Sequence, residues 1–150
     1  MSQAPKSDTN KRLGYPHDAR LLIINADDFG MCHAINAAIV RTLKEGVVGS
    51  TTVMVPCPWA LHAMQWLRDN SHVAFGVHLT ALCDGGAYHW GPLTPKDKAP
   101  SLRDETGYFY RFERMGEFLA QLTMDHLEIE FSAQLLDGVS DQGDDNLSCV

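Results

Sequence analysis

The chain contains 150 residues, 45% of them hydrophobic and 21% charged, and its 12 basic against 19 acidic residues give a net charge of −7. This composition is typical of one globular domain, excludes a disordered chain, and disfavours a nucleic-acid partner, whose phosphates require clustered Lys and Arg. A membrane-spanning helix needs about 18 consecutive apolar residues, and the apolar runs of this sequence are far shorter. We also recognise no signal segment at the N-terminus and no paired cysteine motif, so we predict a cytoplasmic protein without a membrane span.

The first third of the chain predicts a leader, a strand and a helix. Residues 1–20 are polar and aperiodic, which is typical of a flexible leader. The apolar run over 21–26 predicts a strand buried on both faces of a parallel sheet. Apolar residues then recur at helical spacing up to a stop at Gly46, namely Ile35, Ile39 and Leu43.

Two further strands and a helix follow. Residues 47–55 are rich in Val and Thr and predict a strand, and Pro58 suits the first turn of a second helix. One side of that helix is apolar, with Ala60, Ala63, Met64 and Leu67. A third strand is predicted over 73–77, and the strand–helix alternation indicates a parallel sheet with right-handed crossovers.

The second half of the chain predicts a long loop, two helices and a tail. Residues 80–110 contain several glycines, prolines and aromatic residues, and such a loop either faces a ligand or packs as a satellite cluster. One helix is predicted from the spacing of Phe112, Met115, Phe118, Leu119 and Leu122. A second is predicted from Asp125 through Leu127, Phe131 and Leu135. Residues 137–150 are predicted to be a disordered acidic tail.

Candidate chemistry lies at two strand ends. Asp27 and Asp28 follow the first strand and His78 follows the third, so parallel strands place them at one edge of the sheet. Adjacent carboxylates favour a cation or a proton between them, and Asp with His is a common set of ligands for a divalent metal ion. The alternative for the acidic pair is an ordinary turn. Two other histidines are weaker candidates for the site. His33 follows the acidic pair but is more typical of a surface residue at a helix start, and His89 lies in the long loop.

Three motifs in order resemble the YdjC-like family of carbohydrate deacetylases: residues 24–30 (INADDFG), 50–55 (STTVMV) and 76–80 (GVHLT). The segments 91–93, 100–102 and 107–110 are also similar to the long loop of that family. The resemblance covers residues 20–134, so we interpret 21–136 as a partial YdjC-like domain.

This resemblance implies a deformed (β/α) barrel with parallel strands that uses a divalent metal ion, Mg or Zn, to remove N-acetyl groups from amino sugars or chitooligosaccharides. Carried over to this chain, Asp27 resembles the catalytic base, while Asp28 and His78 resemble two of three metal ligands. The sequence leaves open which aspartate binds the metal.

The chain departs from the family in its length and in its third ligand. Family members are about twice as long, and their third metal-binding histidine lies in a later motif that has no counterpart here. We therefore interpret the chain as truncated or frame-shifted, with impaired activity. A non-catalytic remnant that binds sugar or a partner chain is an alternative, and a receiver-type signalling domain is another. Open strand edges are typical of chains that associate, so a homo-oligomer is also among the expected partners.

Overall fold

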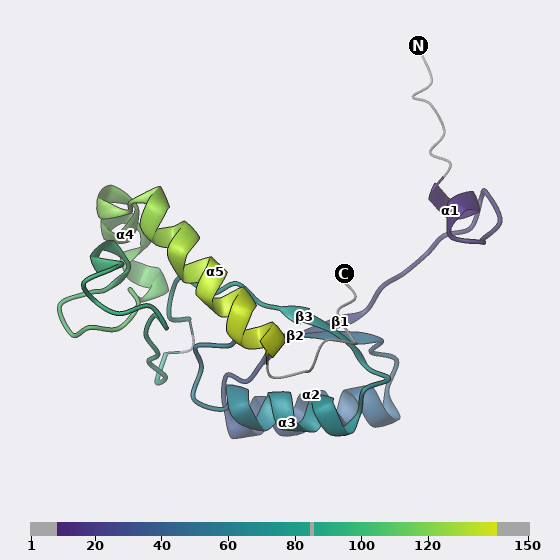
Figure 1. The fold of residues 1–150 in the computed structure, drawn as a ribbon. Helices are drawn as coiled ribbons and strands as arrows, with labels where there is room; N and C mark the ends of the chain where they lie inside the picture. Colours follow the sequence, from purple (N-terminus) through teal and green to yellow (C-terminus); the bar gives the residue numbers. More distant parts are fainter. Residues whose placement is uncertain (1–8, 85, 141–150) are drawn as a thin grey trace, which may run out of the picture.

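The computed structural model describes residues 9–84 and 86–140, and its central unit alternates strands and helices. The order is β1 (Asn25–Phe29), α2 (His33–Glu45), β2 (Ser50–Val53), α3 (Ala60–Asp69) and β3 (Ala74–Val77). Two 3₁₀ helices and two α-helices follow, η1 (Pro100–Leu102), η2 (Phe112–Arg114), α4 (Met115–Gln121) and α5 (Met124–Ser140). A short helix, α1 (Thr9–Arg12), has no buried residue and lies apart from the sheet (Figure 1). Residues 1–8 of the predicted leader lie outside the described residues.

The three strands form one parallel sheet in the order β1-β2-β3. Asn25 of β1 pairs with Ser50 of β2, and Ser50 pairs in turn with Ala74 of β3. The predicted parallel α/β architecture is therefore confirmed. The sheet is open, because among the described residues β1 and β3 each pair on one side only.

The start of β1 differs from the sequence prediction. The strand begins at Asn25, four residues later than predicted, and the apolar run before it is exposed. Leu22 and Ile23 are 82% and 75% exposed. The prediction of burial on both faces is wrong for this segment because, within the described residues, β1 is an edge strand and nothing covers its beginning.

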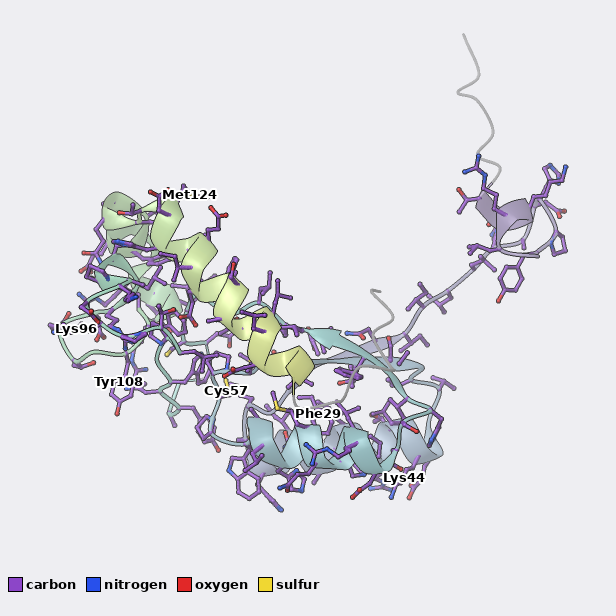
Figure 2. The ribbon with its side chains drawn as sticks, viewed as in Figure 1. Phe29, Lys44, Cys57, Lys96, Tyr108 and Met124 are labelled. Carbon is purple, nitrogen blue, oxygen red and sulfur yellow. The ribbon has the colours of Figure 1, made fainter. Side chains whose placement is uncertain are left out.

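Helices α2 and α3 pack on one face of the sheet and form the first core (Figure 1). Phe29 at the end of β1 is fully buried between the sheet and these helices (Figure 2). The predicted apolar side of α3 is confirmed, because its buried residues are Ala60, Ala63, Met64 and Leu67. On α2, Ile39 is buried, while Ile35 and Leu43 are partly buried against the same core.

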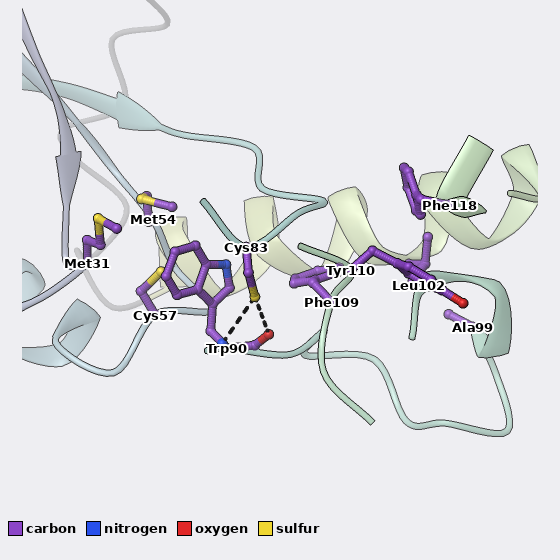
Figure 3. Close-up of a cluster of buried hydrophobic side chains, with 10 residues drawn as sticks. All are labelled: Met31, Met54, Cys57, Cys83, Trp90, Ala99, Leu102, Phe109, Tyr110 and Phe118. Atoms are coloured by element: carbon purple, nitrogen blue, oxygen red, sulfur yellow. Dashed lines mark hydrogen bonds between the residues drawn. The ribbon is translucent and has the colours of Figure 1, made fainter. Parts of the chain in front are cut away.

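The long loop has a core of its own, which joins it to the strand ends. Ten buried residues form this cluster, Met31, Met54, Cys57, Cys83, Trp90, Ala99, Leu102, Phe109, Tyr110 and Phe118 (Figure 3). Cys83 Sγ accepts a hydrogen bond from the Trp90 N–H group at 3.4 Å and donates one to the Trp90 carbonyl at 3.2 Å. Tyr108 lies at the margin of the loop and is 44% exposed (Figure 2). Most of the loop is therefore a packed layer.

The last two helices differ from their predicted apolar faces. On α4, Phe118 is buried, but Leu119, predicted on the same face, is 59% exposed. On α5, Leu135 is 46% exposed, whereas Glu130 and Gln134 are completely buried. The predicted face of α5 is wrong there because polar side chains make the contacts to the rest of the fold. The helix also continues to Ser140, beyond the predicted boundary at Leu136, and residues 141–150 of the predicted tail lie outside the described residues.

Candidate active site

Asp28 and His78 meet at the carboxyl end of the sheet. Asp28 Oδ1 lies 3.4 Å from His78 Nδ1, and the Asp28 N–H group donates a hydrogen bond to the same nitrogen at 3.4 Å. The backbone N–H group of His78 donates a hydrogen bond to the Val53 carbonyl at 2.8 Å, which holds His78 against the end of β2. Asp28 lies in β1 and His78 directly follows β3, and these two strands are separated by β2.

A β-bulge at the acidic pair contributes to this arrangement. The pairing of β1 with β2 shifts between Ala26 and Phe29, so two residues of β1, Asp27 and Asp28, lie opposite one residue of β2. Asp28 has a φ of 63°, in the left-handed region, and no other described non-glycine residue has a positive φ. Bulges next to active sites re-aim side chains, and strained backbone is commonly found at such positions. The local structure is therefore more irregular than an ordinary acidic turn.

Negative charge is concentrated around Asp28. The pKa of its carboxyl group lies above the ordinary value, first because of burial and second because of the Asp27 carboxylate. His78 lowers this pKa, and Asp84 raises it slightly further. The side chains of His78 and Asp28 are 35% and 38% exposed, so a solute can reach both. Several carboxylates around a half-buried position favour a cation or a proton there.

A cavity of about 230 Å³ opens at the site. Asp28 and His78 line it together with Thr80, Asp84 and Phe112, among others. Sequence reasoning missed Asp84, because a single aspartate before two glycines in a loop carries no motif. The volume is below the about 300–1,000 Å³ typical of ligand pockets, so this cavity suits a small chemical group better than a whole ligand.

The other sequence candidates lie elsewhere or have no assigned contact to the site. Asp27 is exposed beside Asp28. The His33 ring packs edge-on against Trp59, with ring centroids 4.9 Å apart, and the His89 ring lies 5.6 Å from that of Tyr108. Neither histidine lines the cavity. Across residues 9–84 and 86–140, no group of three or more His, Cys, Asp or Glu side chains is placed to hold a metal ion. In the same ranges, no helix is long and apolar enough to cross a membrane.

The fold and the site define an α/β protein with polar residues at the carboxyl ends of parallel strands, and comparisons with known proteins name its family. The sequence model of YdjC-like proteins matches residues 21–140. The chain therefore belongs to the YdjC-like family.

Relatives in this family are named for reactions on carbohydrates. A carbohydrate deacetylase of Enterococcus faecalis is 37% identical over 116 residues, which cover 77% of this chain and 42% of the relative. A chitooligosaccharide deacetylase of Yersinia enterocolitica is 31% identical over the same shares, 77% and 42%. A crystal structure from Enterococcus faecalis, named for cellobiose-phosphate cleavage, is similar with a TM-score of 0.69 at 35% identity, covering 79% of this chain and 43% of that one. The chain thus spans about two fifths of the length of the proteins it matches.

Family membership decides between the fold alternatives. The receiver-type signalling domain is wrong, because the chain matches YdjC-like proteins over most of its length. The open three-stranded sheet, together with the coverage of the solved relative, confirms that the chain contains part of the family fold.

Proposed function

We propose that this chain carries part of a metal-dependent site that removes N-acetyl groups from amino sugars or chitooligosaccharides. The observation that carries the proposal is the contact between Asp28 and His78 at 3.4 Å, on a strained bulge at the carboxyl end of the sheet. The names of the relatives support a deacetylase acting on a carbohydrate.

The donor atoms of the site fit a divalent ion in part. Two ligands of a tetrahedral zinc ion, each at about 2 Å, lie roughly 3.3 Å apart. The separation of 3.4 Å between Asp28 Oδ1 and His78 Nδ1 is close to that spacing, and a bound ion would replace the Asp28 N–H group as the partner of the Nδ1 lone pair. When bound, such an ion polarises an amide carbonyl and acidifies a water molecule. We assign Asp28 and His78 as the residues that would hold Zn²⁺ or Mg²⁺.

Asp27 is the proposed general base. It is exposed beside Asp28, so its carboxylate is accessible to the water that attacks the acetyl carbonyl. Asp27 would take the proton of that water and return it to the nitrogen as the C–N bond breaks, which gives acetate and a free amine. The carboxylate of Asp28 would stay engaged with the metal and His78.

We further propose that this chain binds metal weakly and turns over slowly. Catalytic zinc sites usually have three protein ligands, and the described residues bring only Asp28 and His78 together. A misplacement of about 1 Å in an active site costs roughly 100-fold in rate. The same observation favours a second candidate function, a remnant that binds an acetylated sugar without hydrolysing it.

The test is a titration of the whole chain with Zn²⁺ and, separately, Mg²⁺, followed by NMR of the histidine side chains, with acetate release from N-acetylglucosamine oligomers measured in parallel. Asp28→Ala and His78→Ala should abolish binding, and Asp27→Asn should keep binding but lose the residual turnover. His72→Ala, which removes an exposed histidine just before β3, is the matched control and should change neither binding nor turnover.

The outcomes separate the two candidate functions. Binding of Zn²⁺ or Mg²⁺ that is unaffected by His78→Ala contradicts the assigned site. Sugar binding without a metal requirement and without acetate release favours the binding remnant. We also propose that the long loop, residues 80–110, faces the substrate. Hydrogen exchange with a chitooligosaccharide tests this, and unchanged protection of the loop at saturating ligand contradicts it.

A further inference from the structure

Helix α5 buries a polar stripe where an amphipathic helix buries an apolar one. Glu130 and Gln134 are completely buried, and Gly138, one turn further along, is buried as well. Leu135 and Leu136 on the same helix are 46% and 71% exposed. Burying polar side chains costs free energy unless they are hydrogen-bonded, so the partners of this stripe indicate its purpose.

Gln134 binds the segment that carries His78. Its Nε2 group donates to the Thr80 carbonyl at 2.7 Å, and its Oε1 atom accepts from the Thr80 N–H group at 2.9 Å. The Thr80 hydroxyl group in turn donates to the His78 carbonyl at 2.8 Å. One amide side chain thus satisfies both backbone groups of Thr80, and Thr80 is tied to His78. Thr80 lies beyond the end of β3 at Val77, past the backbone hydrogen bond from the His78 N–H group to the Val53 carbonyl.

Glu130 holds Gln134 and a further part of the long loop, residues 93–94. Its carboxylate accepts hydrogen bonds from the N–H groups of Leu93 and Thr94 at 3.0 and 2.9 Å, and from the Thr94 hydroxyl group. Gln134 Nε2 donates to it at 2.8 Å. Four donors satisfy the acceptor sites of this buried carboxylate and fix the rotamer of Gln134.

Gly138 completes the contact between α5 and the site. A Cβ atom at this position would lie 2.6 Å from Val77 Cγ2, so the helix backbone approaches the last residue of β3 closely. Three successive turns of α5 therefore contact the end of β3 and the long loop: Gly138 approaches Val77, Gln134 binds Thr80, and Glu130 binds residues 93–94. Figure 1 shows α5 running from α4 to the neighbourhood of β3, which it contacts.

We propose that Gln134, held by Glu130, is a positioning residue that sets the place of His78 in the metal site. This inference rests on the proposed function, because it assigns His78 as a ligand. Gln134 contacts no reacting atom, and it acts through Thr80. The loop at 93–94 is tied to the same pair of side chains, so the long loop and the metal ligand are held by one helix.

The experiment compares Gln134→Leu with Gln121→Leu in the whole chain. Gln121 is a matched control, because its Nε2 group also donates to a backbone carbonyl, that of Ser101 at 3.0 Å, and it lies on α4. Zn²⁺ alone is titrated into each variant at a temperature where circular dichroism shows it folded, and the His78 imidazole resonances report the dissociation constant. We expect binding at least tenfold weaker for Gln134→Leu and within twofold of the original chain for Gln121→Leu.

A second pair of variants tests the link itself if Gln134→Leu fails to fold. Thr80→Val removes the hydroxyl donor to His78 and keeps the side-chain shape. Thr42→Val removes an equivalent bond, from Thr42 Oγ1 to the Ile39 carbonyl at 2.9 Å, on α2. We expect Thr80→Val alone to weaken Zn²⁺ binding, by about threefold or more, and to shift the His78 imidazole resonances of the metal-free chain.

The results distinguish failure of this inference from failure of the proposed function. If the original chain binds no Zn²⁺ through His78, the proposed function is contradicted and, with it, the role assigned to Gln134. If the original chain binds Zn²⁺ and the variants at 134 and 80 bind it as well as their controls, the positioning role alone is overturned.

Discussion

Asp28 combines a functional side chain with an unfavourable backbone conformation, and two substitutions separate these properties. Its φ of 63° costs a residue with a Cβ atom roughly 1–2 kcal/mol relative to right-handed backbone. Glycine avoids this cost but loses about 0.5–1 kcal/mol more conformational entropy on folding. Both variants lack the carboxylate, so the comparison cancels its interactions. Asp28→Gly should therefore have a free energy of unfolding about 0.5–1 kcal/mol above that of Asp28→Ala.

Urea denaturation of the two variants, followed by circular dichroism, measures this difference. A change of 1 kcal/mol shifts the melting temperature of a domain of this size by about 2–4 °C, so thermal melts give a second readout. Ala37→Gly on the exposed side of α2 is the control, and there glycine should destabilise by about 1 kcal/mol. An Asp28→Gly variant no more stable than Asp28→Ala would refute the argument that the site stores backbone strain. Both variants should lose Zn²⁺ binding, and retention by either would contradict Asp28 as a ligand.

Two further predictions concern the packing of α5 and the acid stability of the loop. Gly138→Ala should lower the free energy of unfolding by about 1–2 kcal/mol, since overpacking against Val77 outweighs the helix propensity of alanine. Gly116→Ala on α4 is the control and should raise the free energy of unfolding, because no atom lies within 4 Å of the new Cβ. Equal effects of the two substitutions in urea titrations would show that α5 does not approach β3 closely. Burial raises the pKa of Asp104, but hydrogen bonds lower it more, so it lies below its ordinary 3.8. The donors are the hydroxyl and N–H groups of Thr106 and the N–H group of Tyr108. The carboxylate therefore stabilises the fold fully above that value, and the contribution is lost as the pH falls through the lower, folded-state pKa. Asp104→Asn should weaken the dependence of the free energy of unfolding on pH at acid pH. Urea midpoints measured between about pH 2 and 6 test this, and the same pH dependence in the variant and the original chain would contradict it.

The local order of strands and helices was predictable because short apolar runs and helical periodicity are written into neighbouring residues. The apolar side of α3 and the end of α2 at Gly46 are confirmed, since each depends on spacing within one helix. The meeting of Asp28 with His78 was predictable for a similar reason. Parallel strands bring their carboxyl ends to one edge, whatever lies between them.

The sequence did not predict which surfaces become buried, because burial depends on neighbours far away in the chain. The apolar run at 21–24 is exposed because β1 is an edge strand in the described residues, and sequence alone carries no information on strand order. The bulge at Asp28 arises from the register between β1 and β2, so the left-handed backbone there was invisible in the motif.

Helix α5 illustrates the same limit at the site itself. Leu127 makes the predicted apolar contact, but Leu135 is exposed, and Glu130 and Gln134 are completely buried. Their partners, Thr80 and the loop at 93–94, lie 36 to 54 residues away in sequence, and a polar side chain shows no preference for burial until such donors and acceptors surround it. The sequence determined the residues available for chemistry and the elements that carry them. Only the tertiary structure decided how the ligand-bearing segment is held, because that depends on hydrogen bonds between backbone groups and side chains brought together by the fold.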